Sequence, residues 1–265
     1  MSKLTRVLAR SSTAGIAFAL AMTAAVVAKA DQSDAKKLLK AMSDYMAAQP
    51  AMSFAYDAIL DVVTKDGQKL ALVSSGDVLV NRPDKIRTTR AGGFGDVELS
   101  FDGKTLTLFG KNANVYAQVE VPGTLEHLVD ELREKYHRPL PAADLLLSTS
   151  YDELMRDVVD IKDLGSGVVG GVECDTFAFR KNDADFQIWI AQGNRPYPCR
   201  YTITSRLLPS APQYTVEVRN WKGGNEVAAG NFTFKNATNA QKIDPKEVRD
   251  KFSDLPAHFT MGGEK

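Results

Sequence analysis

The chain has 265 residues, with 33 Lys and Arg against 33 Asp and Glu, so its formal net charge is zero. It has no cluster of basic residues and is therefore a poor candidate for a nucleic-acid-binding protein, because counterion release needs clustered Lys and Arg. After residue 30 no apolar run is long enough to span a membrane.

Residues 1–30 have the layout of a secretory signal peptide. Basic residues lie near the start, Ser11 to Ala28 carries no charge, and a small-x-small pattern ends at Ala30. This order is typical of secretory signal peptides, so we expect cleavage after Ala30 and a periplasmic location. An uncharged run of 18 residues also approaches the minimum for a membrane anchor, which is the alternative.

Without this segment the chain has 29 Lys and Arg against 33 Asp and Glu, because residues 1–30 contain four basic residues and no acidic one. No linker, repeat or low-complexity tract divides residues 31–265. One β domain can contain a chain of this length. We therefore expect a single, mildly acidic domain over 31–265.

The first predicted element of this domain is an amphipathic helix over residues 31–49. Its apolar residues recur at three- and four-residue spacing and form one stripe, which is typical of a helix that packs on a core. Pro50 ends the helix, because proline has no backbone N–H to donate.

From residue 52 to residue 121 the pattern changes to six short strands. Turn signals such as Asp66-Gly67 separate them, and apolar residues alternate with polar ones, most clearly around Val97, Leu99 and Phe101. A period of two predicts one buried face and one solvated face for each strand.

Residues 122–157 are predicted to form a helical insert between two β regions. Thr124 can cap a first helix, and Ser150 with Glu153 has the spacing of a capping box for a second. A second set of strands follows the insert.

This second set of predicted strands covers five segments, and we expect the polar tail from residue 236 to be loosely packed. The segments are Val172–Arg180, Asp185–Ala191, Cys199–Arg206, Gln213–Trp221 and Val227–Lys235.

Together these elements indicate a mainly β, α+β fold: a curved antiparallel half-barrel sheet of about eleven strands with an N-terminal helix and a helical lid. Large open sheets curl, and a curled sheet has a concave apolar face that must be covered. The N-terminal helix and the insert 122–157 are the two segments available for this.

Cys174 and Cys199 are the two cysteines, and in an exported protein such a pair predicts a disulfide, with two free thiols as the alternative. The three histidines, His127, His137 and His258, have no paired spacing with either cysteine, so we expect no metal site. No known nucleophile, metalloprotease or phosphate-loop motif is found, so we expect neither catalytic residues nor a cofactor.

Two short stretches resemble the bacterial periplasmic lipoprotein-carrier family, LolA and its relatives. The first is Ser75–Pro83, similar to the carriers' strand that ends in Arg-Pro, and the second is Ser100–Leu106, similar to their S-D-G-K-T-L hairpin. The segments 185–190, 201–205 and 212–221 are similar to a related family of predicted periplasmic proteins of unknown function.

The resemblance implies a fold in which a curved sheet and a helical lid enclose an apolar cavity for acyl chains. It also implies that Arg82, which matches the carriers' strand-ending arginine, donates hydrogen bonds that keep the lid shut. The alternative for Arg82 is a surface arginine at a strand end. The cysteine pair, the greater length and the mildly acidic charge depart from the carriers, so the expected ligand is an apolar chain rather than a lipoprotein in particular.

Alternation along the strands and the apolar part of the insert predict the residues that contact such a ligand. They are Phe54, Tyr56, Val97, Leu99 and Phe101 on the sheet and Leu145, Leu146 and Leu147 in the lid.

The expected function is periplasmic binding or carriage of a lipid or another apolar chain, without catalysis. Two alternatives remain: a regulatory or assembly module of the envelope that binds a protein partner, and a hydrolase. A partner-binding module would expose a large apolar patch. A hydrolase would need a buried acid or histidine with a perturbed pKa.

Overall fold

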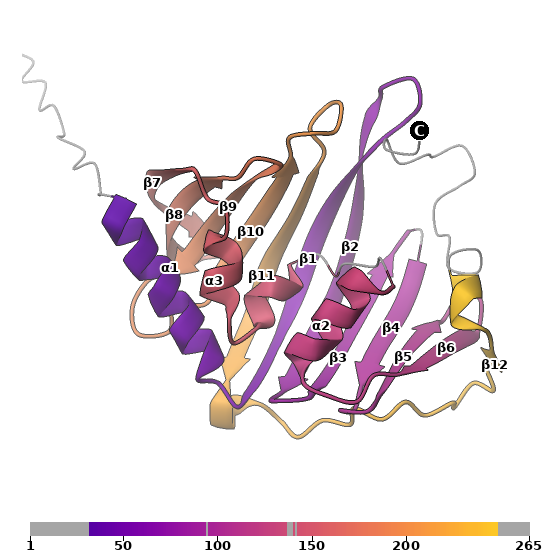
Figure 1. Ribbon diagram of the computed structural model, residues 1–265. Coiled ribbons are helices and arrows are strands. Elements are labelled where there is room, and N and C mark those ends of the chain that lie inside the picture. The colour runs from indigo at the N-terminus through magenta and orange to yellow at the C-terminus, as the bar shows by residue number, and fades with distance from the viewer. Residues whose placement is uncertain (1–31, 94, 137–139, 141, 249–265) are drawn as a thin grey trace, which may run out of the picture.

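The computed structural model describes residues 32–93, 95–136, 140 and 142–248; the predicted signal peptide with its cleavage site, His137 and His258 lie outside the described residues. Within the described residues, twelve strands form one sheet, with helices on one of its faces (Figure 1). The elements in chain order are α1 (Gln32–Ala47), β1 (Ala51–Val63), β2 (Lys69–Asn81), β3 (Lys85–Gly92), β4 (Gly95–Phe101), β5 (Thr105–Gly110), β6 (Val115–Glu120), α2 (Leu125–Glu134), η1 (Ala143–Leu146), α3 (Ser150–Met155), β7 (Asp160–Val169), β8 (Val172–Arg180), β9 (Ala184–Ala191), β10 (Pro198–Ser205), β11 (Gln213–Gly223), η2 (Gly224–Glu226), β12 (Gln241–Lys242) and η3 (Pro245–Glu247).

The strand order across the sheet is β12-β6-β5-β4-β3-β2-β1-β11-β10-β9-β8-β7.

Two antiparallel meanders meet at β1. Strands β2 to β6 follow one another on one side of β1, and β11 back to β7 follow on the other. β1 pairs with β2 along its whole length, from Ala51 opposite Asn81 to Val63 opposite Lys69, and its other edge pairs with β11. The two halves therefore share one continuous face, which confirms the predicted mainly β, curved sheet.

Alternation decides which side chains face the helices. In β1, Met52, Tyr56 and Ala58 lie on the helix-covered, concave face and are buried, whereas Ile59 on the opposite, convex face is 40% exposed. The pairing of strands carries this alternation across the sheet, because residues opposite one another share a face. The main hydrophobic core accordingly lies between the concave face and the helices.

The helices form where the sequence predicts them. Ser43 of α1 lies 2.6 Å from the Ser150 hydroxyl, and the backbone N–H of Tyr151 donates to the Ser43 Oγ at 3.0 Å, so polar bonds join α1 to α3. α1 buries one apolar stripe in the core: Ala35, Leu39, Met42 and Met46.

The predicted strand at Val227–Lys235 is wrong. These residues form no strand; they run across the convex face of the sheet instead. The physical reason is topological: β11 already pairs with β1 on one edge and β10 on the other, so the chain that follows it has no adjacent free edge. The alternating Phe232 and Phe234 are nevertheless packed, because Phe232 is buried and Phe234 contacts Phe109 and Tyr116.

The expectation of a loosely packed tail from residue 236 is also wrong as far as residue 248. Ala240 and Ile243 are buried, and β12 pairs in parallel with β6. Asn236 stabilises the turn that leads into β12, because its side-chain oxygen accepts a hydrogen bond from the backbone N–H of Ala240 at 2.6 Å. We call residues 224–248 the strap, because they connect the centre of the sheet to its β12 edge.

β7 was not predicted as a separate strand. Gly165, Ser166 and Gly167 interrupt its apolar alternation, and its register with β8 shifts between Asp163 and Gly165. Such a bulge breaks the period of two on which the prediction depends.

We predict that Gly76 cannot be replaced by alanine without loss of stability. A Cβ at Gly76 would lie 1.9 Å from the carbonyl oxygen of Thr89 and 2.8 Å from the ring of Tyr56. Because the backbone oxygen cannot move away easily, Gly76→Ala should lower the free energy of unfolding by about 1–3 kcal/mol in urea denaturation. Gly167→Ala is the matched control, since a Cβ there meets nothing within 4 Å; equal effects of the two substitutions would contradict the prediction.

Candidate ligand-binding site on the concave face

The strand residues predicted to contact a ligand all lie on the concave face. Phe54 is opposite Val78, Val78 opposite Thr88, and Thr88 opposite Leu99, so Phe54 and Leu99 belong to one row across four strands. The remaining three share this face by alternation along β1 and β4: Tyr56, Val97 and Phe101.

These residues differ in how much of them a ligand could reach. Leu99 and Phe101 are buried in the main core, whereas Phe54 and Val97 are only partly buried. Phe101 is fully buried, so it supports the face rather than lining a surface that is open.

The three lid leucines are divided between two clusters. Leu145 belongs to the main core, and Leu146 packs against that core. Leu147 is buried in a separate cluster with Val129 and Ala143, inside the insert itself. The structure thus brings Leu145 and Leu146, but not Leu147, to the sheet side of the insert.

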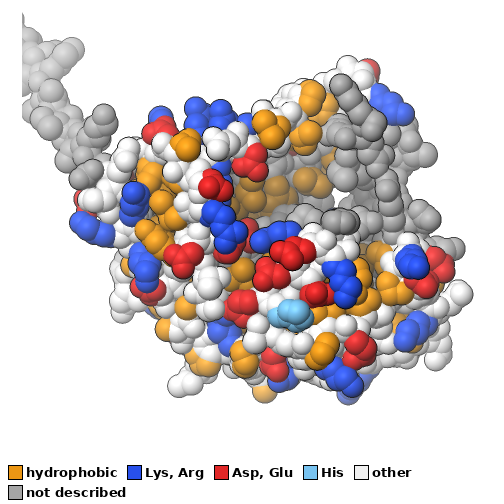
Figure 2. All heavy atoms as spheres, in the orientation of Figure 1, with side chains coloured by type: hydrophobic (Ala, Val, Ile, Leu, Met, Phe, Trp, Pro, Cys, Tyr) orange, Lys and Arg blue, Asp and Glu red, His pale blue; other side chains and the backbone are white. Residues whose placement is uncertain are grey.

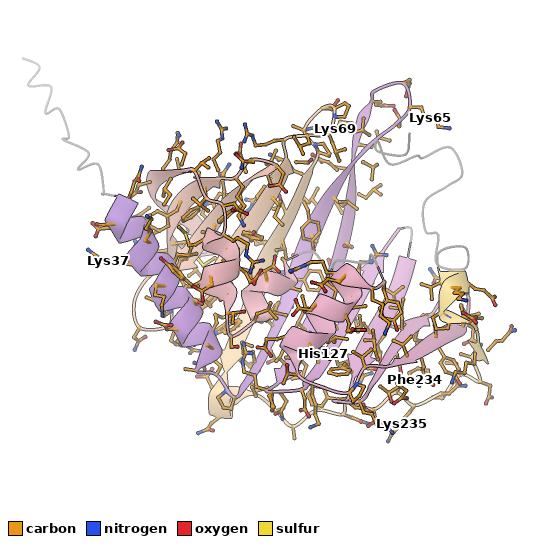
Figure 3. All side chains as sticks on the ribbon, in the orientation of Figure 1. Lys37, Lys65, Lys69, His127, Phe234 and Lys235 are labelled. Atoms are coloured by element: carbon orange, nitrogen blue, oxygen red, sulfur yellow. A yellow bond between two sulfur atoms is a disulfide. The ribbon has the colours of Figure 1, made fainter. Side chains whose placement is uncertain are left out.

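Beyond the helices, the concave face continues as an apolar surface that is only partly covered. Leu60, Leu70 and Leu72 are partly exposed and lie outside the main core, on the part of β1 and β2 nearest their hairpin. Figure 2 shows a hollow above the helices with hydrophobic side chains at its base, and Figure 3 shows Lys65 and Lys69 at the hairpin end, away from the helices. We call this surface, which the helices of the described chain leave partly exposed, the hollow.

Two strands of the second meander complete the hollow. Tyr214 of β11 is opposite Leu60, and Ile203 of β10 is opposite Tyr214. The prediction missed these two residues and the leucines of the hollow, although the alternation of β2, β10 and β11 would have placed them on the concave face.

Tyr56 lies on β1 between the hollow and the part of the concave face that the helices cover. Its ring passes over Gly76, and its hydroxyl donates to the carbonyl oxygen of Thr89 at 2.9 Å. Burial raises the pKa of Tyr56, and it raises the pKa of Tyr214 to about 12. Both phenols are therefore neutral at physiological pH and can serve as hydrogen-bond donors.

Arg82 is hydrogen-bonded to the helical insert, residues 122–157, which we call the lid. Arg82 follows β2, and its Nη2 donates to the carbonyl oxygen of Leu146 at 2.5 Å. The Arg82 side chain is 12% exposed and its Nη1 lies 3.9 Å from Glu126. Burial lowers the pKa of Arg82, and Glu126 acts against this shift. The bond joins the end of β2 to the insert, and Arg82 is the residue for which the resemblance implies a latch.

Two further polar contacts hold the lid together. Glu126 of α2 accepts hydrogen bonds from the backbone N–H and the hydroxyl of Ser148, at 3.1 and 2.8 Å. Arg133 of α2 donates to Asp144 of η1 at 2.8 Å. Burial raises the pKa of Asp144, and the positive charge of Arg133 opposes this.

Within residues 32–93, 95–136, 140 and 142–248, no group of three or more His, Cys, Asp or Glu side chains is arranged to hold a metal ion. His127 is exposed on α2 (Figure 3). No helix of the described chain is both long and apolar enough to cross a bilayer.

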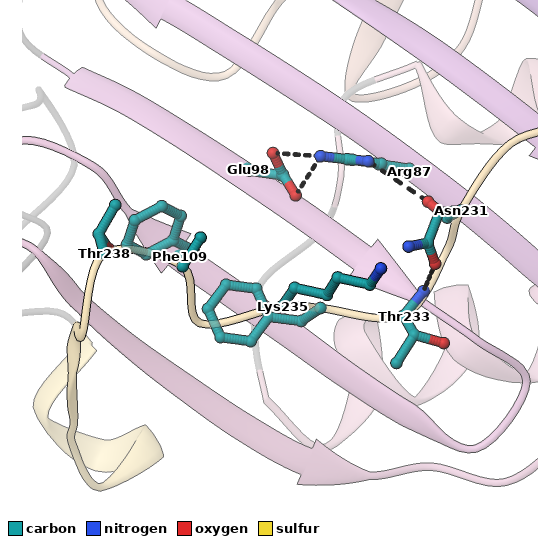
Figure 4. A pocket seen from close by; sticks show the side chains of 9 residues that line it. Arg87, Glu98, Phe109, Asn231, Thr233, Lys235 and Thr238 are labelled. Carbon is teal, nitrogen blue, oxygen red and sulfur yellow. Dashed lines mark hydrogen bonds and ion pairs between the residues drawn. The ribbon is translucent and has the colours of Figure 1, made fainter.

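The convex face carries a separate polar pocket of about 250 Å³ beneath the strap (Figure 4). Arg87 donates to Glu98 at 3.0 Å and to the carbonyl oxygen of Asn231 at 3.4 Å. The aromatic pair Phe109 and Phe234, with ring centroids 5.5 Å apart, lines it as well. The contacts of Arg87 with Asn231 and of Phe109 with Phe234 fasten the strap to β3 and β5.

The predicted disulfide is confirmed: Cys174 of β8 is bonded to Cys199 of β10. β9 lies between these two strands in the sheet, so the bond crosses one strand.

An open curved antiparallel sheet with a helical cover on its apolar face is the class of fold that the sequence resemblance implied. A model of the family described as "Predicted periplasmic protein (DUF2092)" matches residues 35–245. The chain belongs to this family, which confirms the expected membership of a family of predicted periplasmic proteins of unknown function. No curated protein shows a significant match to this sequence.

Solved structures with a similar arrangement are distant in sequence. The lipoprotein LppX of Mycobacterium tuberculosis is 11% identical with a TM-score of 0.47, covering 76% of this chain and 100% of that one. LprF of Mycobacterium bovis is 13% identical with a TM-score of 0.47, covering 76% and 98%. A LolA superfamily protein of Nitrosomonas europaea is 12% identical with a TM-score of 0.34, covering 76% and 97%.

We predict that Arg82→Ala loosens the lid without unfolding the sheet. The substitution removes a charge-assisted hydrogen bond to Leu146, an interaction worth about 1.5–3 kcal/mol. Amide hydrogen exchange in residues 143–155 should accelerate about tenfold or more, whereas Arg219→Ala on the convex face should leave it unchanged. Unaltered protection of residues 143–155 in Arg82→Ala would rule out a latch.

The contact between Glu126 and Ser148 should depend on pH. Burial acts to raise the pKa of Glu126, but hydrogen bonds from Ser148, from its own backbone N–H and from Thr124 together outweigh it and leave the pKa below its ordinary value. The contribution of Glu126 to stability is then present above its unfolded-state pKa of about 4.3 and is lost as the pH falls through the lower folded-state pKa.

We therefore expect exchange at Ser148 and its neighbours to accelerate as the pH is lowered below about 4. Glu126→Gln removes the titrating group, so this variant should show a smaller pH dependence at the same amides. An identical pH dependence in both proteins would exclude Glu126 as the cause.

Proposed function

We propose that this chain is a non-catalytic periplasmic binding or carrier protein that holds an apolar chain, such as a lipid acyl chain, against the concave face. In this proposal, residues 1–30 direct export and are cleaved after Ala30, and residues 31–265 form the mature domain. Arg82 acts as the latch of the lid.

The observation that carries the proposal is the incomplete cover of an apolar surface. The lid and α1 bury part of the concave face, whereas Leu60, Leu70 and Leu72 remain partly exposed in the hollow. Burial of an acyl chain contributes about 0.8 kcal/mol per CH₂ group, so contact with one long chain would give useful affinity. The membership of a family described as periplasmic agrees with a role in lipid handling outside the cytoplasm.

The direct test is the content of the protein when it is purified without detergent. Solvent extraction followed by mass spectrometry should detect lipid in an amount comparable with that of the protein. Protein that carries no lipid and also fails to bind a neutral naphthylamine probe would contradict the proposal.

Two adjacent residues of β2 provide a matched pair of variants. Leu72 faces the hollow, whereas Val73 is 68% exposed on the convex face. Leu72→Asp should weaken binding of the neutral probe about tenfold or more, because it replaces apolar contact area with a charge that binding would desolvate. Val73→Asp should bind as the wild type does; equal losses in the two variants would show that the hollow is not the site.

A second candidate function, binding of an envelope protein, is favoured by the edge of the sheet at β7. Val159, Leu164 and Val168 are 63%, 51% and 68% exposed on or beside this edge strand. Edge strands can pair with a strand of another protein. A photo-crosslinker at Leu164 should then trap one defined envelope protein in intact cells that a crosslinker at Val73 does not trap, and the same products from both positions would argue against this function.

A further inference from the structure

The turn between β10 and β11 exposes a run of apolar side chains to solvent. Leu207 is 75% exposed and Leu208 is 39% exposed, and Pro209 and Ala211 beside them are exposed as well. A single exposed leucine is ordinary in a folded protein, but consecutive exposed apolar residues are unusual unless they have a function. We call residues 206–212 the apolar turn.

Hydrogen bonds fix the backbone of the apolar turn. Inside the turn, the N–H of Ala211 donates to the carbonyl oxygen of Leu208 at 3.2 Å. Ser210 and Ala211 have φ values of 62° and 43°, in the left-handed region that residues other than glycine rarely adopt. Arg206 Nη1 donates to the carbonyl oxygen of Lys181 at 2.5 Å and so ties the turn to the connection between β8 and β9. The two leucines therefore project from a turn that is held in place on both sides.

The apolar turn lies at the end of the sheet that carries the hollow. Tyr214, which is opposite Leu60 in the hollow, follows the turn by two residues. The backbone N–H of Gln213 donates to Asp61 of β1 at 3.1 Å, so the turn stands beside the hairpin of β1 and β2 (Figure 1). Figure 2 shows hydrophobic side chains at the surface along this rim of the hollow. Whatever binds the apolar turn is therefore brought next to the hollow.

The charges at this end of the sheet do not oppose contact with an anionic surface. The turns at 64–69, 181–183 and 206–212 contain four basic and two acidic residues: Lys65, Lys69, Lys181 and Arg206, and Asp66 and Asp183. Lys69 also pairs with Asp61 at 3.4 Å, which reduces the positive excess. Figure 3 shows Lys65 and Lys69 on the hairpin that adjoins the apolar turn. Lysines near a bilayer surface are attracted to anionic phospholipids, so these charges agree with a membrane as the partner.

The size and shape of the patch also favour a membrane over a protein. A stable protein interface buries about 800 Å² on each partner and involves about 20–30 residues. The apolar turn offers four exposed apolar residues at the tip of a connection between two strands. A small projecting tip can enter the boundary between head groups and acyl chains of a bilayer, where each buried apolar side chain adds to the affinity.

We propose that the apolar turn is a membrane-docking site, and that Leu207 and Leu208 enter the surface of a phospholipid bilayer and bring the hollow against it. The binding is reversible, because two leucines bury far less apolar surface than a spanning helix. The inference rests on the proposed function for its purpose, since it names the partner that supplies or receives the apolar chain.

Flotation with lipid vesicles tests the inference on the exported protein, purified from the periplasmic fraction. One set of vesicles contains phosphatidylethanolamine and phosphatidylglycerol, and the other contains phosphatidylcholine alone. The test variant is Leu207→Gln with Leu208→Gln, which removes the apolar side chains without changing the charge. The matched control is Ile59→Gln with Val73→Gln, because these residues are 40% and 68% exposed but lie on the convex face.

The wild type and the control variant should float with both kinds of vesicle. The variant of Leu207 and Leu208 should bind about tenfold or more weakly, because burial of two leucine side chains is worth about a hundredfold or more in affinity. This variant should still bind the neutral naphthylamine probe in the absence of vesicles, which shows that it is folded and that the hollow is intact.

A second readout reports insertion itself. Leu207→Trp should add a fluorescence signal that lipids with brominated acyl chains quench, whereas the two native tryptophans of the wild type, Trp189 and Trp221, should not be quenched to the same degree. Equal fractional quenching of the two proteins would contradict insertion of the apolar turn.

The remaining outcomes separate this inference from the proposed function. If the wild type binds neither kind of vesicle, or if the variant of Leu207 and Leu208 binds as the wild type does, docking through the apolar turn is overturned, and probe binding by the wild type would leave the proposed function standing. If vesicle binding depends on the two leucines but the wild type does not bind the probe, docking is supported and the proposed function fails.

Discussion

The pairing of β1 with both β2 and β11 is the constraint on which the rest of the structure depends. β1 belongs to the first meander by sequence, and β11 ends the second, so this contact joins two sheets that could otherwise be separate. The alternation of Met52, Tyr56 and Ala58 then continues across the join in both directions. One long apolar face results, and the fold must either cover it or use it.

The cover is built from two distant parts of the chain, and both are bonded to the sheet or to one another by a few polar groups. α1 packs through its apolar stripe and through Ser43, which contacts α3. The lid is joined to the end of β2 by Arg82. Apolar packing supplies most of the stability of such a cover, whereas the polar bonds fix its position. A cover held at few points is compatible with the proposed entry of a ligand to this face.

The sequence predicted most of the fold because most strands keep a strict period of two and are separated by clear turn residues. The helical insert followed from capping signals, and the disulfide followed from the presence of two cysteines in a chain that the sequence predicts to be exported. The two errors arise where alternation and strand formation do not coincide. Residues 227–235 alternate like a strand, but no adjacent edge of the sheet is available to them. β7 is a strand, but its bulge interrupts the alternation.

The candidate site was predicted less completely for a related reason. Alternation placed Phe54, Tyr56 and Leu99 on the concave face, but it could not show which of these the helices bury and which they leave accessible. The residues of the hollow, Leu72 and Tyr214 among them, became apparent only when the extent of the cover was known.

The strap has a mechanical consequence for the hollow. It leaves the centre of the sheet after β11 and passes Leu79 at Gly230 and Arg87 at Asn231. Phe234 then packs against Phe109 and Tyr116, and the strap pairs with β6 near its end. It is therefore attached at several points across the convex face of β2 to β6, and these contacts stiffen that half of the sheet. In the other half, the strap meets the loop between β9 and β10 through the ion pair of Arg195 with Glu226, at 2.9 Å. Expansion to accept a bulkier ligand would then come from the helices and from β7 to β10, whose strands the described part of the strap does not cross.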